Sequence, residues 1–148
     1  MTRAALDSNI LVYAELERES AKGRRAASLI TRAARDGVIP VQALGEFLRV
    51  VQRRVPEAFD NAARQVAIYQ DVFLTPATTN AVLGDAAALA RDHRLRLWDC
   101  IICAAALQSG AGIFLTEDMQ DGRLIGRMRL LNPFLVSNTG AINAALRR

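Results

Sequence analysis

The chain is poor in the side chains that most enzymes use as nucleophiles, bases or phosphate ligands. Its 148 residues include one histidine, His93, two cysteines and a single lysine, Lys22. No G-x-S-x-G segment and no glycine-rich loop followed by lysine occurs, which argues against a serine hydrolase and against a P-loop nucleotide site. His93 stands in an arginine-rich stretch at a predicted helix end, where a surface or capping role is expected.

The two cysteines, Cys100 and Cys103, form a C-x-x-C pair inside an apolar run. A redox pair or half of a zinc site is the alternative to two buried thiols. Because no second C-x-x-C or paired histidine accompanies them, small buried thiols are favoured. Reduced thiols are typical of cytoplasmic proteins, so a cytoplasmic location is expected.

Long hydrophobic runs, repeats and low-complexity segments are also missing. The longest apolar run, residues 101–107, is too short to cross a bilayer, and Asp7 interrupts the first apolar stretch. Neither a membrane span nor a signal peptide is therefore expected. Hydrophobic residues make up 51% of the chain and charged residues 23%, which is enough for one globular domain with a sizeable core.

The net charge is +4, and every cation of the chain except Lys22 is an arginine. The arginine clusters lie at residues 24–25, 53–54, 91–96 and 123–129. Each cluster alone is typical of a solvated helix face. The excess of positive charge permits binding of a polyanion without requiring it.

Short apolar segments alternate with helical patterns along the chain. Strands are predicted at residues 3–6, 38–41, 71–74, 113–116 and 128–131, and helices at residues 9–16, 22–36, 42–54, 56–70, 80–93 and 99–108. Gly37 is expected to cap the second helix. The alternation predicts an α/β fold, a three-layer α/β/α sandwich with a short central parallel sheet. One domain is expected at residues 1–136, with a loose or weakly helical tail at residues 137–148.

Four acidic residues stand where such a sheet would gather them. Asp7 follows the first strand, Asp118 follows the strand at 113–116, Glu46 lies in the first turns of a helix, and Asp99 opens the most apolar helix. Because strand ends and the helix starts after them share one edge of a parallel sheet, we expect the four carboxylates to converge.

Clustered carboxylates raise one another's pKa unless some stay protonated or a divalent cation neutralises them. Carboxylates without nearby histidine or cysteine suit Mg²⁺ or Mn²⁺, and such an ion can activate water for phosphodiester hydrolysis. Each acid also has a plainer interpretation. Asp7, Asp99 and Asp118 can cap helices or turns, and Glu46 can pair with an arginine of its own helix. Four acids at one edge exceed what capping requires.

Four motifs, in order and suitably spaced, resemble a known family. They are LDSNILVY at residues 6–13, GEF at 45–47, LWDCII at 97–102 and FLTEDMQDG at 114–122. Together they resemble the PIN-domain ribonucleases, and within them the VapC-type toxins of type II toxin–antitoxin systems. The resemblance covers nearly the whole chain up to Phe134.

The resemblance implies a Mg²⁺- or Mn²⁺-dependent endoribonuclease that acts on RNA. It also implies a cognate antitoxin that covers the site, and frequent homodimers. The residues that map onto the family's acidic catalytic and metal-binding positions are Asp7, Glu46, Asp99 and Asp118. Asp121 is a further candidate metal ligand, although several relatives have histidine there. Thr116 and Ser8 map onto hydroxyl positions that organise the site.

Two other functions compete with this hypothesis. One is a phosphoacceptor receiver domain or an aspartate-nucleophile phosphatase. A phosphatase wants a second aspartate at the position of Asn9, and both classes want a lysine near the pocket, for which Lys22 is badly placed. The other is a binding module without catalysis, against which the full set of four acids argues. For a nuclease, we expect arginine clusters to flank the acidic groove and hold the RNA backbone.

Overall fold

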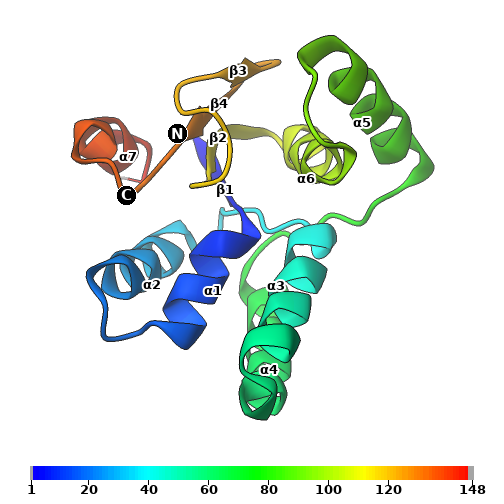
Figure 1. Ribbon diagram of the computed structural model, residues 1–148. Coiled ribbons are helices and arrows are strands. Elements are labelled where there is room, and N and C mark those ends of the chain that lie inside the picture. Colours follow the sequence, from blue (N-terminus) through cyan, green and yellow to red (C-terminus); the bar gives the residue numbers. More distant parts are fainter. Residues whose placement is uncertain (1, 147–148) are drawn as a thin grey trace.

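A short sheet organises the computed structural model, which describes residues 2–146. Its elements in chain order are β1 (Arg3–Leu6), α1 (Ser8–Leu16), α2 (Ala21–Ala33), α3 (Val41–Arg54), the 3₁₀ turn η1 (Pro56–Ala58), α4 (Phe59–Val72), α5 (Asn80–His93), α6 (Leu97–Gln108), β2 (Ala111–Leu115), β3 (Leu124–Ile125), β4 (Met128–Leu131), η2 (Val136–Asn138) and α7 (Thr139–Ala145). Figure 1 shows α6, backed by α5, on one side of the strands and α7 on the other. The expected three-layer α/β/α class is confirmed.

The strands run in the order β1-β2-β4-β3. The pairs β1–β2 and β2–β4 are parallel, as predicted. The pair β3–β4 is antiparallel and was not predicted. Gly126 begins the two-residue turn between them and takes a φ of 60°, a conformation that glycine adopts at little cost.

Two predicted strands are reduced to single bridges. Val38 pairs with Ala5 on one side and with Leu74 on the other. The predicted strand at residues 38–41 stops early because Pro40, which has no N–H to donate, is the N-cap of α3. The predicted strand at residues 71–74 is short because α4 continues to Val72. Both bridges are parallel, so they extend the sheet beyond β1 without changing its sense.

The α6 helix passes through the interior, as its apolar sequence predicted. All seven of its residues from Cys100 to Ala106 are buried. Both cysteines are free, and burial raises the pKa of each thiol. A raised pKa disfavours the thiolate that redox chemistry needs, so the two cysteines are core residues.

Two predicted helix boundaries differ from the structure. α2 ends at Ala33, and the positive φ after it, 82°, belongs to Arg35 rather than to Gly37. A Cβ at Gly37 would clash first with the Ala33 carbonyl oxygen and then with the Phe73 ring at 2.8 Å, so this glycine permits a close approach to the end of α2 and to Phe73. α6 begins at Leu97, which places Asp99 inside its first turn instead of at the cap.

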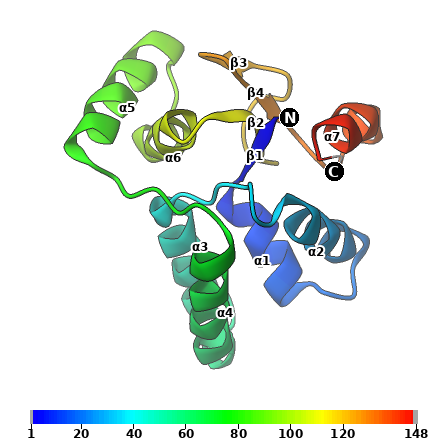
Figure 2. The ribbon, with the colours of Figure 1, turned by 180° about the vertical axis from the view of Figure 1, so that it is seen from behind.

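Residues 139–145 form the helix α7, beside the sheet in both views (Figures 1 and 2). Ile142 and Leu146 are buried in the main core. Of the two alternatives predicted for residues 137–148, loose or weakly helical, the structure has the helical one, and this helix packs on the core up to residue 146. Residues 147–148 of that prediction lie outside the described residues. In the part of the chain that the structure describes, no helix combines the length and the apolar composition that a membrane crossing requires.

Candidate active site

Asp7 stands at the junction of β1 and α1. It is the N-cap of α1, and its Oδ1 accepts a hydrogen bond from the Ser8 backbone N–H at 2.7 Å. Its own backbone N–H donates to the Leu115 carbonyl at 3.1 Å, which ties the end of β1 to the end of β2. Only 4% of Asp7 is exposed. The sheet edge thus holds a carboxylate in the protein interior.

Thr116 joins Asp7 to Asp118. It follows β2 directly and is 1% exposed. Its hydroxyl donates to Asp7 Oδ2 at 2.8 Å and accepts from the Asp118 backbone N–H at 3.1 Å. One buried hydroxyl therefore orients both acids, which supports the organising role expected of this position.

Asn9 lies between the same two carboxylates. Its Nδ2 is 3.3 Å from Asp7 Oδ2 and 3.1 Å from Asp118 Oδ2, and 3.3 Å from Thr116 Oγ1. Its Oδ1 accepts from the backbone N–H of Glu117 at 3.3 Å. The sequence predicted no site role for Asn9, which was named only as the position where a phosphatase wants a second aspartate. The signal for its role is its place in the first turn of α1, two residues after Asp7.

Glu46 and Asp99 bring the other two carboxylates to the site. Ser8 donates its hydroxyl to Glu46 Oε2 at 3.3 Å, so the second expected hydroxyl also orients an acid. Burial and the nearby Asp99 charge raise the pKa of Glu46. Asp99 itself accepts from Arg96 Nε at 3.2 Å. Asp7 thus lies within electrostatic reach of Glu46 and Asp118, and Glu46 lies within electrostatic reach of Asp99.

The charge on Asp7 is poorly compensated by the protein. Burial raises the pKa of Asp7 to about 7, and the charges of Glu46 and Asp118 add to the rise, against the hydrogen bonds from Thr116 and Ser8. Within the described residues, no lysine, arginine or histidine forms an ion pair with Asp7, Glu46 or Asp118. An anionic Asp7 is therefore costly unless a cation binds beside it.

Glu117 shows the opposite situation one residue before Asp118. Lys22 and the Tyr13 hydroxyl both donate to its carboxylate. Burial alone would raise the pKa of Glu117, but these two hydrogen bonds outweigh it and lower the pKa. The protein supplies its own cation here, so Glu117 does not need a metal. Glu117 was not among the predicted site residues, although it follows the predicted strand at 113–116 directly.

Asp121 is engaged elsewhere. Its Oδ1 accepts from the Asn132 backbone N–H and from Asn138 Nδ2, each at 2.8 Å. Among residues 2–146, no hydrogen bond links Asp121 to the other four acids. Its carboxylate instead holds the segment that leads into α7.

The donor set fits a hydrated divalent ion better than a fully protein-coordinated one. Within residues 2–146, no three carboxylate, imidazole or thiol side chains are arranged to hold one ion by themselves. Mg²⁺ commonly keeps several waters and uses one or two carboxylates. Asp7 and Asp118, which share the Asn9 amide, are such a pair. Glu46 reaches the same site through its hydrogen bond from Ser8.

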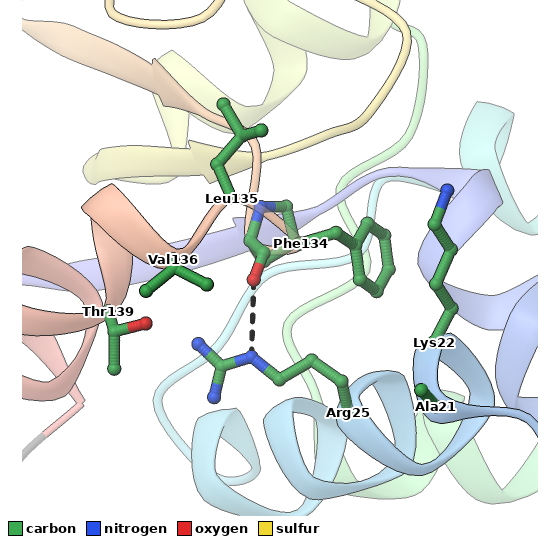
Figure 3. Close-up of a pocket in the computed structure, with 8 residues that line it drawn as sticks. Ala21, Lys22, Arg25, Phe134, Leu135, Val136 and Thr139 are labelled. Atoms are coloured by element: carbon green, nitrogen blue, oxygen red, sulfur yellow. Dashed lines mark hydrogen bonds between the residues drawn. The ribbon is translucent and has the colours of Figure 1, made fainter.

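A separate hollow lies between α2 and the segment before α7 (Figure 3). Its volume is about 370 Å³, and its lining includes Lys22, Arg25, Phe134 and Val136. Arg25 Nε donates to the Pro133 carbonyl at 3.2 Å, which fixes the guanidinium across the hollow. None of the four acids lines it, so this hollow is distinct from the acidic site.

We expect Thr116→Val to lower the free energy of unfolding by about 1–3 kcal/mol, because a buried carboxylate loses its donor and a backbone N–H loses its acceptor. Urea unfolding at pH 8 without divalent ions measures the change. Thr31→Val is the matched control, since the Thr31 hydroxyl bonds to the Ala27 carbonyl on the exposed surface of α2. Equal effects of the two substitutions would contradict the assigned role of Thr116.

Comparison with known proteins identifies the fold. The PIN domain family model matches residues 4–120. No curated protein sequence matches the chain. A toxin–antitoxin complex from Klebsiella pneumoniae has a TM-score of 0.66 at 18% identity, over 90% of this chain and 99% of that chain. VapC20 from Mycobacterium tuberculosis, described as a sarcin-ricin loop cleaving toxin, has a TM-score of 0.63 at 16% identity, over 75% of this chain and 86% of that chain.

A third similar structure is the DNA-bound VapBC complex from Salmonella typhimurium. Its TM-score is 0.63 at 15% identity, over 88% of this chain and 97% of that chain. Identities this low carry information on the fold alone. The family match, by contrast, covers residues 4–120 and so includes Glu46 of α3 and the loop after β2 that carries Asp118. The chain belongs to the PIN domain family.

Proposed function

We propose that this protein is an endoribonuclease toxin of a toxin–antitoxin system and that it depends on Mg²⁺, with Mn²⁺ as a substitute. The observation that carries the proposal is the buried Asp7 carboxylate, held beside Asp118 by Thr116 and Asn9. Among residues 2–146, no cationic side chain forms an ion pair with it. A PIN domain with this acidic site fits hydrolysis of phosphodiester bonds. The similar VapC20 is described as cleaving the sarcin-ricin loop, which supports RNA as the substrate.

Asp7 and Asp118 are the residues that would hold the ion directly, and Glu46 and Asp99 would contact its waters. When bound, the ion neutralises the carboxylates and polarises the scissile phosphate. Thr116 and Asn9 keep the two direct ligands in place through the hydrogen bonds described above. We do not assign Asp121 to the metal, because its carboxylate bonds to Asn132 and Asn138.

Arginine must offset the repulsion between these acids and RNA. The predicted arginine clusters contribute one direct hydrogen bond to the four acids within the described residues. It runs from Arg96 to Asp99. Arg123 is engaged by His93, and Arg54 pairs with Glu17. Within the cluster at residues 91–96, Arg91 pairs with Asp92. Arg94 and Arg96 are therefore the arginines that we propose for contact with the RNA backbone, because Arg96 lies beside the acidic site.

The partners follow from the same proposal. The similar complexes contain an antitoxin or a promoter DNA fragment, as their descriptions state. We infer a cognate antitoxin that covers the acidic site, and a homodimer as the toxin form. A receiver domain or phosphatase is not favoured, because Lys22 bonds to Glu117 and is not free to contact a phosphate at Asp7.

Cleavage of structured RNA tests the proposal. We expect the purified chain to cut RNA with Mg²⁺ or Mn²⁺ and to stop when EDTA is added, because the acids then lack their cation. Product lengths on a denaturing gel measure the reaction. Asp60→Asn, an exposed acid in the first turn of α4, is the control and should cut within about two-fold of the wild type. Cleavage that persists in EDTA, or no cleavage by a folded protein with either ion, would contradict the proposal.

A further inference from the structure

Trp98 is an exposed aromatic residue directly beside a site acid. It is the only tryptophan of the chain and is 59% exposed. Neither hydrophobic cluster of the described residues includes it. Tryptophan is usually well buried, and its exposure at a functional rim is typical of a recognition residue.

The indole and the acid extend from the same end of α6. Trp98 and Asp99 both belong to its first turn, where side chains lean toward the helix N-terminus. The Asp99 side chain is bound by Arg96, and its charge raises the pKa of Glu46. α6 also packs against α3, the helix that carries Glu46, so the first turn of α6 borders the acidic site through Asp99. Trp98 is the residue that precedes Asp99 in this turn.

An aromatic ring next to arginine matches the chemistry of single-stranded RNA. An unpaired base can stack on an indole, while guanidinium groups hold the adjoining phosphates. Arg91, Arg94 and Arg96 precede Trp98 within eight residues, and all three are exposed. Tryptophan is also common at protein interfaces. Arg91 pairs with Asp92 and Arg96 with Asp99, so Arg94 leaves a net positive charge in residues 91–99. This net positive charge favours a nucleic acid over an apolar protein surface.

We propose that Trp98 stacks on an unpaired base of the RNA strand that enters the acidic site. This inference rests on the proposed function and deepens it. Trp98 is then a substrate-positioning residue, and the preferred substrate is unpaired RNA such as a loop rather than a continuous duplex. The exposed Leu97, at 41% exposure, lies beside Trp98 and lacks a stacking face, so it offers a matched control.

Because Trp98 is the only tryptophan, fluorescence excited at wavelengths that the two tyrosines do not absorb reports on Trp98 alone. The experiment uses the Asp7→Asn protein, to prevent cleavage, with short single-stranded oligoadenylate. A strand of the same length without bases keeps the phosphates and serves as the control ligand. We expect the oligoadenylate to quench the fluorescence and the abasic strand to leave it unchanged.

In the same background, Trp98→Ala should weaken oligoadenylate binding by about 5- to 150-fold, the range expected for loss of one stacked base. Fluorescence anisotropy of end-labelled RNA measures this affinity. Trp98→Phe should recover much of the loss, and Leu97→Ala should bind within about two-fold of the parent. With Asp7 intact, Trp98→Ala should raise KM for RNA and leave kcat nearly unchanged.

Three results would overturn the inference. The first is RNA binding by anisotropy with no change in tryptophan fluorescence, and the second is equal quenching by the abasic strand. The third is a Trp98→Ala protein that keeps its RNA affinity but changes its oligomeric state in size-exclusion chromatography, which would assign Trp98 to a protein interface. Failure of the proposed function would give a different result from failure of the stacking proposal. If oligoadenylate quenched the fluorescence but the wild type showed no metal-dependent cleavage, the nuclease proposal would be overturned and the stacking proposal would be retained.

Discussion

Asp7→Asn should abolish metal-dependent RNA cleavage while leaving the protein folded. Asp7 is the most buried of the four acids and the one that both Thr116 and Asn9 contact. A metal ligand supplies several kcal/mol of charge stabilisation, and each 1.36 kcal/mol is a tenfold change in rate. The expected loss of kcat is therefore about 1000-fold or more, measured on the same structured RNA with Mg²⁺. Wild-type activity in the Asp7→Asn protein would show that the site is elsewhere.

The same substitution should make the metal-free protein harder to unfold. Burial raises the pKa of Asp7 to about 7, above the value of about 3.9 for an unfolded aspartate. A raised folded pKa contributes stability that is fully present below the unfolded value and is lost as pH rises through about 7. At pH 8 in EDTA, Asp7→Asn should thus increase the free energy of unfolding by on the order of 2 kcal/mol.

Urea unfolding at pH 8 and at pH 5 separates charge from hydrogen bonding. At pH 5 the wild-type Asp7 is largely protonated, so the advantage of Asp7→Asn should mostly disappear. Mg²⁺ at pH 8 should stabilise the wild type and not the variant, because only the wild type binds the ion. A variant that is less stable than the wild type at both pH values would contradict this account.

Asp118→Asn and Asp121→Asn should differ greatly in activity despite lying three residues apart. Asp118 shares the Asn9 amide with Asp7, so its loss should lower kcat by about 100-fold or more. Asp121 bonds to Asn132 and Asn138 through one oxygen, which an asparagine retains. Asp121→Asn should therefore stay within about three-fold of the wild type.

The cleavage rates of the two variants are compared at saturating Mg²⁺, and circular dichroism checks that both variants fold. The two substitutions remove the same charge at nearly the same place in sequence, so each is the control for the other. A loss in Asp121→Asn as large as that in Asp118→Asn would place Asp121 at the metal after all.

The convergence of the four acids followed from position along the chain. Asp7 and Asp118 each come just after a strand, and parallel strands end at a common edge. Glu46 and Asp99 lie in the first turns of helices, which the hydrophobic pattern located to within about two residues. These features are local, so a single sequence contains them.

The partners of each acid depended on the assembled fold. Nothing local distinguishes Asp118, which meets Asn9, from Glu117, which meets Lys22, or from Asp121, which meets Asn138. These contacts join residues that are 17 to 109 positions apart. Only the packing of α1, α2 and the C-terminal segment around one strand end selects among them.

The sequence by itself determined the α/β class, most helices, the buried α6 and the edge at which the acids gather. It did so because hydrophobic periodicity and strand-end position are encoded within short segments. The tertiary structure alone decided that Val38 and Leu74 form single bridges and that Ile142 and Leu146 join the core. It also decided that Asp7 has no cationic ion-pair partner in the part of the chain that the structure describes. Burial and charge compensation are properties of neighbours in space, and the chain order does not list those neighbours.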